Sequence, residues 1–470
     1  MKPIEKEQPV LRYGYDSALA VNKDGSLVLG APPFLGIAKT NPNVFVSYSV
    51  FYERSLEELA EMFNVSFPIV LEENNYIDPV LKMYNYVPFL PDLEVKLGTV
   101  DEYMEQENKF VYPIPIFSMS FFESEPVRLP DNVLHAINKG LCKVAIMLTT
   151  EGTEIRYSDF EWMKTFSRLN SLDSSNFIFT TNNQLVEQQY NAFRAFTLSN
   201  NFVTVFKDMH FEDQLWFIQE HTRDTRTRRN MWLHLESQIE NLKKARYDKH
   251  FLCFNRRPHM HRVLMCSAIM SNEKISAKGI LTLGRENPEV CLNIKRHITY
   301  VLENEARVKN KDVILEHLYN LDLSEDIHYD IDSQYNAAGN LNRIAHESTF
   351  LNLVNETLVN SGTVFFSEKI FKPIYMCQPF ILYGNKGSLK VLRELGYKTF
   401  DKWWDESYDD IEHWAERASK IVEVLEEIST WSQERLIKIR KEMRPVVEHN
   451  FFTMMDNTRA FKKIDLFKVN

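Results

Sequence analysis

Residues Thr349–Gly384 read TFLNLVNETLVNSGTVFFSEKIFKPIYMCQPFILYG, and their pattern indicates the fold class. The apolar run Thr349–Val354 has the length of a strand and is short for a helix. Ser367 belongs to the residue types favoured at helix N-caps, so the segment Ser367–Met376 predicts a helix. A second apolar run, Pro379–Tyr383, predicts another strand. A strand, a helix and a strand in this order predict a βαβ unit with parallel strands, and therefore an α/β fold.

Strands and helices alternate in two series along the chain, one from Lys143 and one from His250. The remaining members of these series are the expected strands Val144–Leu148, Asn176–Thr180, Phe202–Phe206, His250–Phe254 and Gly279–Leu283, and the expected helices Tyr157–Leu169, Gln184–Phe196, Met260–Met270, Glu289–Ala306 and Ser388–Leu395. Residues 307–348 are polar and predict irregular structure between two of these elements. The helical patterns Tyr408–Ile428 and Trp431–Glu448 close the chain. Two such series predict two Rossmann-like lobes.

This pattern suggests four regions. They are an N-terminal accessory or acceptor-side region (1–140), a first Rossmann-like lobe with a linker helix (141–245), a second Rossmann-like lobe (246–430), and a C-terminal helix and tail (431–470). In parallel sheets of this kind, ligands bind at the carboxyl ends of the strands. Residues that directly follow the strands are therefore the first candidates for a functional site.

The composition limits the classes of function. With 470 residues, of which 44% are hydrophobic and 26% charged, the chain can bury full cores. Its formal net charge of −10 gives no general attraction for nucleic acid or anionic membranes. The five cysteines are scattered and form no CxxC pair, which predicts buried, reduced thiols. The N-terminus lacks an apolar signal segment and no run of 18 apolar residues occurs, so we expect no membrane span and a cytoplasmic protein of a bacterium or a virus-infected cell.

Glycine is scarce, with 14 residues, and the sequence contains neither GxGxxG nor GxxxxGK[ST]. A phosphate group therefore has no glycine-rich loop to bind to. Helix N-termini, assisted by arginine and lysine side chains, are the other common way to bind phosphate.

The residues after the strand His250–Phe254 suit an anionic ligand. They are Asn255, Arg256, Arg257, His259 and Arg262, at the expected start of a helix. Cations are unfavourable near a helix N-terminus unless an anion lies nearby. A solvated basic turn, or a salt bridge between the lobes, would account for the same pattern.

A second group follows the strand Thr349–Val354. Glu356 comes at the end of this strand, where a carboxylate can accept hydrogen bonds from sugar hydroxyls. Ser367 and Glu368 suit the first turn of a helix, whereas Lys369 does not unless an anion is close. Lys372 lies on the same helix face as Lys369. An exposed pair of lysines is the alternative interpretation.

The order of Glu356, Ser367-Glu368-Lys369, a helix and the strand Pro379–Tyr383 resembles the donor motif of fucosyltransferase-like GT-B glycosyltransferases. The resemblance covers about residues 345–400 and implies two Rossmann-like lobes with a cleft between them. It implies that Glu356 contacts a nucleotide sugar, and that Lys369 with Arg256, Arg257 or Arg262 binds the diphosphate. Residues 250–450 also look similar to uncharacterised glycosyltransferases of tailed phages and large viruses. The chain has Asn355-Glu356 where the family has Glu-Asn, and Ser367 where it has threonine, which leaves the donor sugar open.

Glycosyl transfer also needs a base on the opposite lobe. The turn Thr149–Glu154 (TTEGTE) follows an expected strand and offers Glu151 first and Glu154 second. The cations of the second lobe would neutralise the departing diphosphate, so we expect no metal cofactor. A rival signal is the DxD sequence Asp330–Asp332, a type that holds metal ions on diphosphates.

Together these patterns predict a metal-independent glycosyltransferase that uses a nucleotide-sugar donor as co-substrate. The acceptor hydroxyl could belong to a glycan, a small molecule or a modified DNA base. Two alternatives remain open: a phage-type enzyme that glycosylates a hydroxymethylated DNA base, and a non-catalytic protein that binds nucleotides or carbohydrates.

Overall fold

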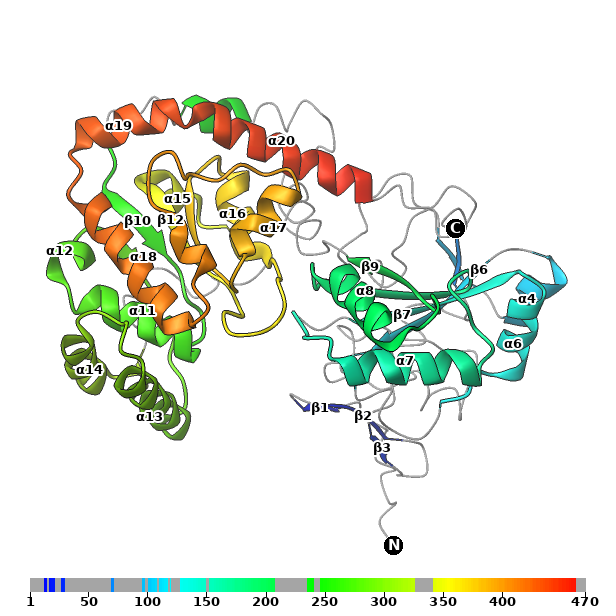
Figure 1. Cartoon of the computed structure of the whole chain (residues 1–470). Helices are drawn as coiled ribbons and strands as arrows, with labels where there is room; N and C mark the ends of the chain where they lie inside the picture. Colours follow the sequence, from blue (N-terminus) through cyan, green and yellow to red (C-terminus); the bar gives the residue numbers. More distant parts are fainter. Residues whose placement is uncertain are drawn as a thin grey trace, which may run out of the picture. The chain divides into compact units, whose positions relative to one another are not determined.

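The computed structural model describes residues 12–14, 17–21, 27–29, 69–71, 95–97, 100–107, 110–116, 119, 127–148, 152–207, 235–240, 246–325 and 341–461. The chain divides into two units: Met1–Asp213 with Arg459–Asn470 form the first unit, and Gln214–Thr458 form the second. Each unit contains a sheet with parallel strands and flanking helices (Figure 1). This confirms the α/β class that the sequence predicts.

Six strands of the first unit form one sheet, in the order β5-β4-β6-β7-β8-β9. Their bounds are β4 (Ile69–Leu71), β5 (Val95–Leu97), β6 (Phe110–Ile116), β7 (Cys142–Leu148), β8 (Phe177–Thr181) and β9 (Thr204–Lys207). Strands β6 to β9 run parallel, and β4 runs antiparallel to both neighbours. The sheet thus takes strands from both sides of residue 140. Strands β1 (Arg12–Gly14), β2 (Ser17–Val21) and β3 (Leu27–Leu29) form a separate antiparallel sheet.

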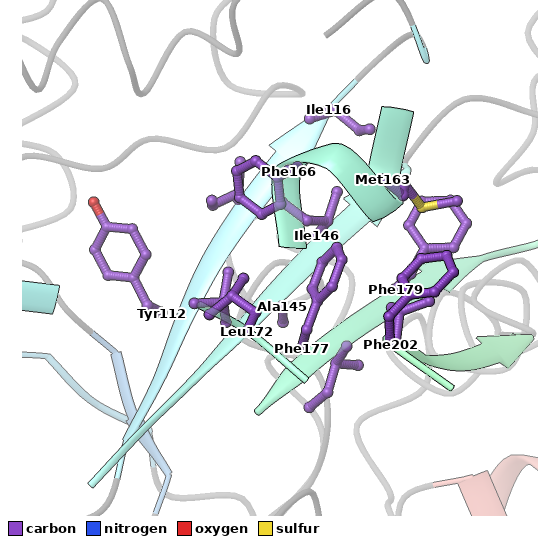
Figure 2. Close-up of a cluster of buried hydrophobic side chains, with 14 of the residues drawn as sticks. Tyr112, Ile116, Ala145, Ile146, Met163, Phe166, Leu172, Phe177, Phe179 and Phe202 are labelled. Atoms are coloured by element: carbon purple, nitrogen blue, oxygen red, sulfur yellow. The ribbon is translucent and has the colours of Figure 1, made fainter. Parts of the chain in front are cut away.

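In the part of the first unit that the structure describes, the large sheet is accompanied by helices α4 (Val100–Glu105), α6 (Asp131–Asn138), α7 (Tyr157–Leu169) and α8 (Val186–Thr197). Ile146 of β7 and Phe177 of β8 pack with Met163 and Phe166 of α7 in the core (Figure 2). All five residues of β8 are buried, so helices or other segments cover both faces of the strand. Such a strand reads in sequence as a continuous apolar run.

The second unit has a four-stranded parallel sheet in the order β11-β10-β12-β13. Its strands are β10 (Lys249–Cys253), β11 (Gly279–Leu281), β12 (Thr349–Asn355) and β13 (Phe380–Tyr383). Its helices are α11 (Met260–Met270), α12 (Glu273–Ser276), α13 (Pro288–Asn304), α14 (Lys311–Asn320), α15 (Arg343–Ser348), α16 (Glu368–Tyr375), α17 (Ser388–Glu394), the short 3₁₀ turn η3 (Ser407–Asp410), α18 (Trp414–Ser429), α19 (Gln433–Glu442) and α20 (Arg444–Phe461).

The expectation of irregular structure across residues 307–348 is wrong in part. Helix α14 lies within it, and its residues Ile314 and Leu318 are buried one helical turn apart. The apolar residues Val313–Leu315 and Leu318 of α14 do have helical spacing, but polar residues surround them in 307–348 and hid this signal. Helix α15 also lies there, and its N-cap residue Asn342 accepts a hydrogen bond from the Ala345 amide.

The strand order of the second unit defines where its ligand site is expected. After β10 the chain crosses through α11 to β11 at one edge, and after β12 it crosses through α16 to β13 at the other edge. Right-handed crossovers in opposite directions place the two helices on opposite faces of the sheet. Accordingly, α11 packs with α18, whereas α16 packs against β12 and β13 (Figure 1). The point between the carboxyl ends of β10 and β12 is the topological switch point, where such sheets bind ligands.

Candidate functional site

A chain of buried amides links the ends of three strands at the switch point. The Asn355 side-chain NH2 donates to the Asn255 side-chain oxygen (2.9 Å), and the Asn255 NH2 donates to the Thr282 carbonyl (3.1 Å). Both asparagines are 1% exposed. Asn255 was predicted to contact a donor, but the structure shows its side chain engaged with the protein. It holds β10, β11 and β12 together at the edge where α11 begins.

Hydrogen bonds connect the start of α11 to the end of β12. His261 Nε2 lies 2.9 Å from the carbonyl oxygen of Glu356, and an Arg262 NH2 group donates to the same oxygen at 3.3 Å. Both side chains are buried. Arg256 and Arg257 precede the helix and are exposed, as is its N-cap residue His259. The basic segment predicted from sequence therefore has a buried part that joins the two strands and an exposed part that can reach a ligand.

Glu356 is fully buried, with 0% exposure. One carboxylate oxygen accepts the Ser367 backbone N–H (3.2 Å), and the other accepts the Ser367 hydroxyl (2.6 Å) and the Thr357 N–H (3.3 Å). Burial raises the pKa of Glu356 above its ordinary value, although Lys369 and the Ser367 hydroxyl oppose the rise. Since donors of this chain already engage the carboxylate, Glu356 has the geometry of a group that positions Ser367, the N-cap of α16.

Lys369 connects the two ends of the loop that runs from β12 to α16. Its Nζ donates to the Thr357 hydroxyl at 3.2 Å and to the Ser367 hydroxyl at 3.0 Å, and lies 3.3 Å from a carboxylate oxygen of Glu368. The Lys369 side chain is 25% exposed and that of Glu368 is 8% exposed. Burial alone would raise the pKa of Glu368, but Lys369 and Lys372 outweigh it and hold this pKa below the ordinary value. Thr357, which anchors Lys369, was not among the predicted residues.

We call five residues the cationic cluster: Arg256 and Arg257 just before α11, Arg262 in its first turn, and Lys369 and Lys372 of α16. Burial lowers the pKa of Lys372 to about 8, helped by the charges of Lys369 and Arg256 and opposed by Glu368. The pKa of His259 is lowered to about 4 by desolvation and by the charges of Arg262, Arg257 and Lys369. The charges of residues around the start of α11 and of residues in α16 thus influence one another.

Glu286, which follows β11, belongs to the same surroundings and was also not predicted. Its charge acts on His259 in the opposite sense to the cations. Its backbone N–H donates to the Leu323 carbonyl at 3.0 Å, which fixes the segment after β11. The sequence offered little signal, because a single half-buried acidic residue after a three-residue strand is common.

Of the predicted base candidates, Glu154 is exposed and lies between β7 and α7 in the first unit. The backbone N–H of Gly152 donates to the Asn182 side chain at 3.0 Å, which ties this segment to the end of β8. Glu151, and Asp330 and Asp332 of the DxD sequence, lie outside the described residues. Within the described ranges, no three His, Cys, Asp or Glu side chains form a group that could hold a metal ion.

Two further sequence-based expectations concern the whole chain. All five cysteines are buried, as expected, and none of them forms a disulfide. Among the helices that the structure describes, none has the length and apolar character needed to cross a membrane.

No protein-family model matches the chain, and no curated protein matches it in sequence. Several solved structures are distantly similar. One is the N-terminal domain of Candida albicans trehalose-6-phosphate phosphatase (TM-score 0.37, 9% identity, covering 77% of this chain and 72% of that one). Another is a UDP-forming α,α-trehalose-phosphate synthase from Burkholderia xenovorans (TM-score 0.37, 10% identity, 77% and 76%). A third is an E. coli trehalose-6-phosphate protein bound with UDP-2-fluoroglucose (TM-score 0.36, 12% identity, 78% and 76%). Likeness at this level assigns the chain to no family.

Proposed function

We propose that this protein is a glycosyltransferase of the GT-B type, and that the diphosphate of its nucleotide-sugar donor binds to the cationic cluster. The observation that carries the proposal is the position of the cluster at the topological switch point. Two helices of opposite crossover direction begin there, and each brings arginine or lysine side chains. Helix N-termini and bidentate arginine donors both favour phosphate oxygens.

The residues of the site have different tasks in this proposal. Arg256 and Arg257 are exposed and would contact the diphosphate directly, with His259 beside them. Lys369 and Lys372 would supply positive charge from the other helix. Glu356, Ser367 and Asn255 would act indirectly, because they hold the strand ends and the start of α16 in place.

The reaction itself is a substitution at the anomeric carbon of the sugar. A bond forms between this carbon and the acceptor oxygen, while the bond to the diphosphate oxygen breaks and leaves its electron pair on the diphosphate. The cationic cluster would stabilise that charge, as a metal-independent reaction requires. A carboxylate, Glu151 or Glu154, would take the proton of the acceptor hydroxyl.

The proposal can be tested with a thermal-shift screen of the full chain against nucleoside diphosphate sugars. A ligand that binds the folded state raises the melting temperature, and one positive donor would identify the nucleotide. The same donor should then release its nucleoside diphosphate when a suitable acceptor is added. Lys369→Met should weaken both effects, whereas Lys438→Met, on the exposed face of α19, should leave both unchanged.

The outcomes separate the alternatives. Donor binding without nucleoside diphosphate release, over a broad range of acceptors, would indicate a non-catalytic binding protein. Salt-sensitive binding to duplex DNA, and turnover on hydroxymethylated duplexes, would indicate the DNA-modifying enzyme. If no nucleotide sugar changes the melting temperature, the glycosyltransferase proposal is wrong.

A further inference from the structure

We propose that the Glu368 carboxylate acts as a place-holder for a phosphate group, pairing with Lys369 until a phosphate-bearing ligand takes its position. This inference rests on the proposed function, since it concerns the same diphosphate site. It assigns to Glu368 a role in setting the affinity of the site for anions, in place of a direct contact with the donor.

The first support comes from the three partners of the Lys369 ammonium group. An ammonium group has three N–H donors, and here they face the Thr357 hydroxyl, the Ser367 hydroxyl and the Glu368 carboxylate. Two of these partners are neutral and hold the loop between β12 and α16. The third is an anion at 3.3 Å, and it is the partner that a phosphate oxygen can replace without loss of the loop contacts.

The second support is the contrast between the two buried carboxylates of the site. Glu356 accepts three hydrogen bonds from the loop and the start of α16, so its position is fixed. The negative charge of Glu368 is instead balanced by two cations, Lys369 in an ion pair and the nearby ammonium of Lys372. These cations keep the pKa of Glu368 low in spite of its burial, so the carboxylate is ionised at neutral pH.

The third support is the effect of the neighbouring charges on the pKa of Lys372. Glu368 stabilises the charged form of Lys372, while Lys369 and Arg256 destabilise it. An anionic ligand within the cationic cluster would have the same stabilising effect as Glu368. The carboxylate and the phosphate therefore compete for one set of cations, and they also repel each other.

This competition gives Glu368→Gln an unusual expected effect. A residue that accepts hydrogen bonds from the donor should weaken binding when it is changed to glutamine. A place-holder should do the opposite, because its removal leaves Lys369 and Lys372 available to the ligand. The two roles thus predict changes of affinity with opposite signs.

The experiment is calorimetric titration of the full chain with inorganic pyrophosphate in metal-free buffer at neutral pH and low salt. Glu368→Gln should bind pyrophosphate about fivefold more tightly than the unchanged chain, because a partly buried ion pair is worth up to about 1 kcal/mol. Glu394→Gln is the matched control, since it changes the net charge equally at an exposed position of α17. Its affinity should equal that of the unchanged chain.

A double variant makes the test specific. If Glu368 competes for Lys369, then Glu368→Gln should bring little gain in affinity when Lys369 is already methionine. A gain that persists in full without Lys369, or an affinity of Glu368→Gln that is unchanged or lower, would overturn the place-holder role. If the unchanged chain and all variants fail to bind pyrophosphate and nucleoside diphosphates alike, the diphosphate site itself is wrong. Failure of the further inference and failure of the proposed function are therefore distinguishable.

Discussion

The hydroxyl of Ser367 lies 2.6 Å from a carboxylate oxygen of Glu356, although the two residues are eleven positions apart. The same hydroxyl oxygen accepts the Lys369 backbone N–H at 3.3 Å and lies 3.0 Å from Lys369 Nζ. One serine thus links a buried carboxylate, the N-cap of a helix and a lysine of the cationic cluster. The short contact fixes the direction of the hydroxyl proton toward Glu356, which leaves the oxygen lone pairs for Lys369.

Ser367→Ala should therefore destabilise the fold as well as the site. Loss of an N-cap costs about 1 kcal/mol, and a buried acceptor left without its donor costs about 1–3 kcal/mol. Because Glu356 keeps its two backbone donors, we expect a total loss of about 2–3 kcal/mol, measured by urea denaturation. Ser367→Thr keeps the hydroxyl and should lose less than half as much. Equal losses for both variants would show that the hydroxyl does not make this link.

The Asn255–Arg262 segment contains exposed charged residues and buried polar residues, and substitutions of the two kinds should have different effects on ligand affinity and on stability. Arg256→Gln and Arg257→Gln remove exposed charges, so each should weaken pyrophosphate binding and change the free energy of unfolding by less than about 0.5 kcal/mol. Calorimetric titration and urea denaturation of the same samples would measure both quantities. If neither arginine variant alters the affinity, the diphosphate does not lie at the start of α11.

Asn255→Ala should lower the stability of the fold and leave the affinity for pyrophosphate almost unchanged. It removes a buried amide that donates to Thr282 and accepts from Asn355, so it should cost about 1–3 kcal/mol of stability. At a temperature where the variant is folded, its affinity for pyrophosphate should be close to that of the unchanged chain. A loss of affinity larger than that of Arg256→Gln, with normal stability, would make Asn255 a direct ligand contact.

The sequence could predict most elements of the second unit, with α14 and α15 as exceptions, but it could not predict the roles of the polar residues. Helix α11 begins and ends where its apolar spacing predicts, and β12 and β13 lie within one residue of their apolar runs. The sequence also places the charged residues after β10 and β12 near one another, because residues that follow neighbouring parallel strands meet at one sheet edge. Which of them face inward depends on contacts between distant segments. The bond from Asn355 to Asn255 joins residues 100 positions apart, and no local pattern indicates it.

Lys372 should make the stability of the protein depend on pH in the alkaline range. Its pKa in the folded chain is about 8, below the ordinary value of 10.5. The folded state therefore binds this proton less tightly than the unfolded state does. Burial of the charged ammonium therefore costs stability. This cost is absent above pH 10.5, grows as the pH falls, and is complete once the pH has fallen through about 8.

Lys372→Met removes this titration. Between pH 7.5 and 10 the unchanged chain should gain on the order of 1–3 kcal/mol relative to the variant, as measured by urea denaturation at each pH. The comparison with the variant cancels the titration of other groups. Parallel stability curves for the two proteins would show that the ammonium group of Lys372 carries no such cost.

The proposed base should be revealed by the turnover number once a donor and an acceptor are known. Glu151→Gln or Glu154→Gln, whichever removes the base, should lower kcat about 10²- to 10⁴-fold, since this is the usual contribution of a positioned acid or base. The donor KM should change little, because the proposed diphosphate contacts come from Arg256, Arg257, Lys369 and Lys372. Glu161→Gln, at an exposed position of α7, is the control and should keep full turnover. Since Glu154 is exposed, its substitution should also leave the melting temperature unchanged. Full turnover by both the Glu151 and the Glu154 variants would place the base elsewhere in the chain.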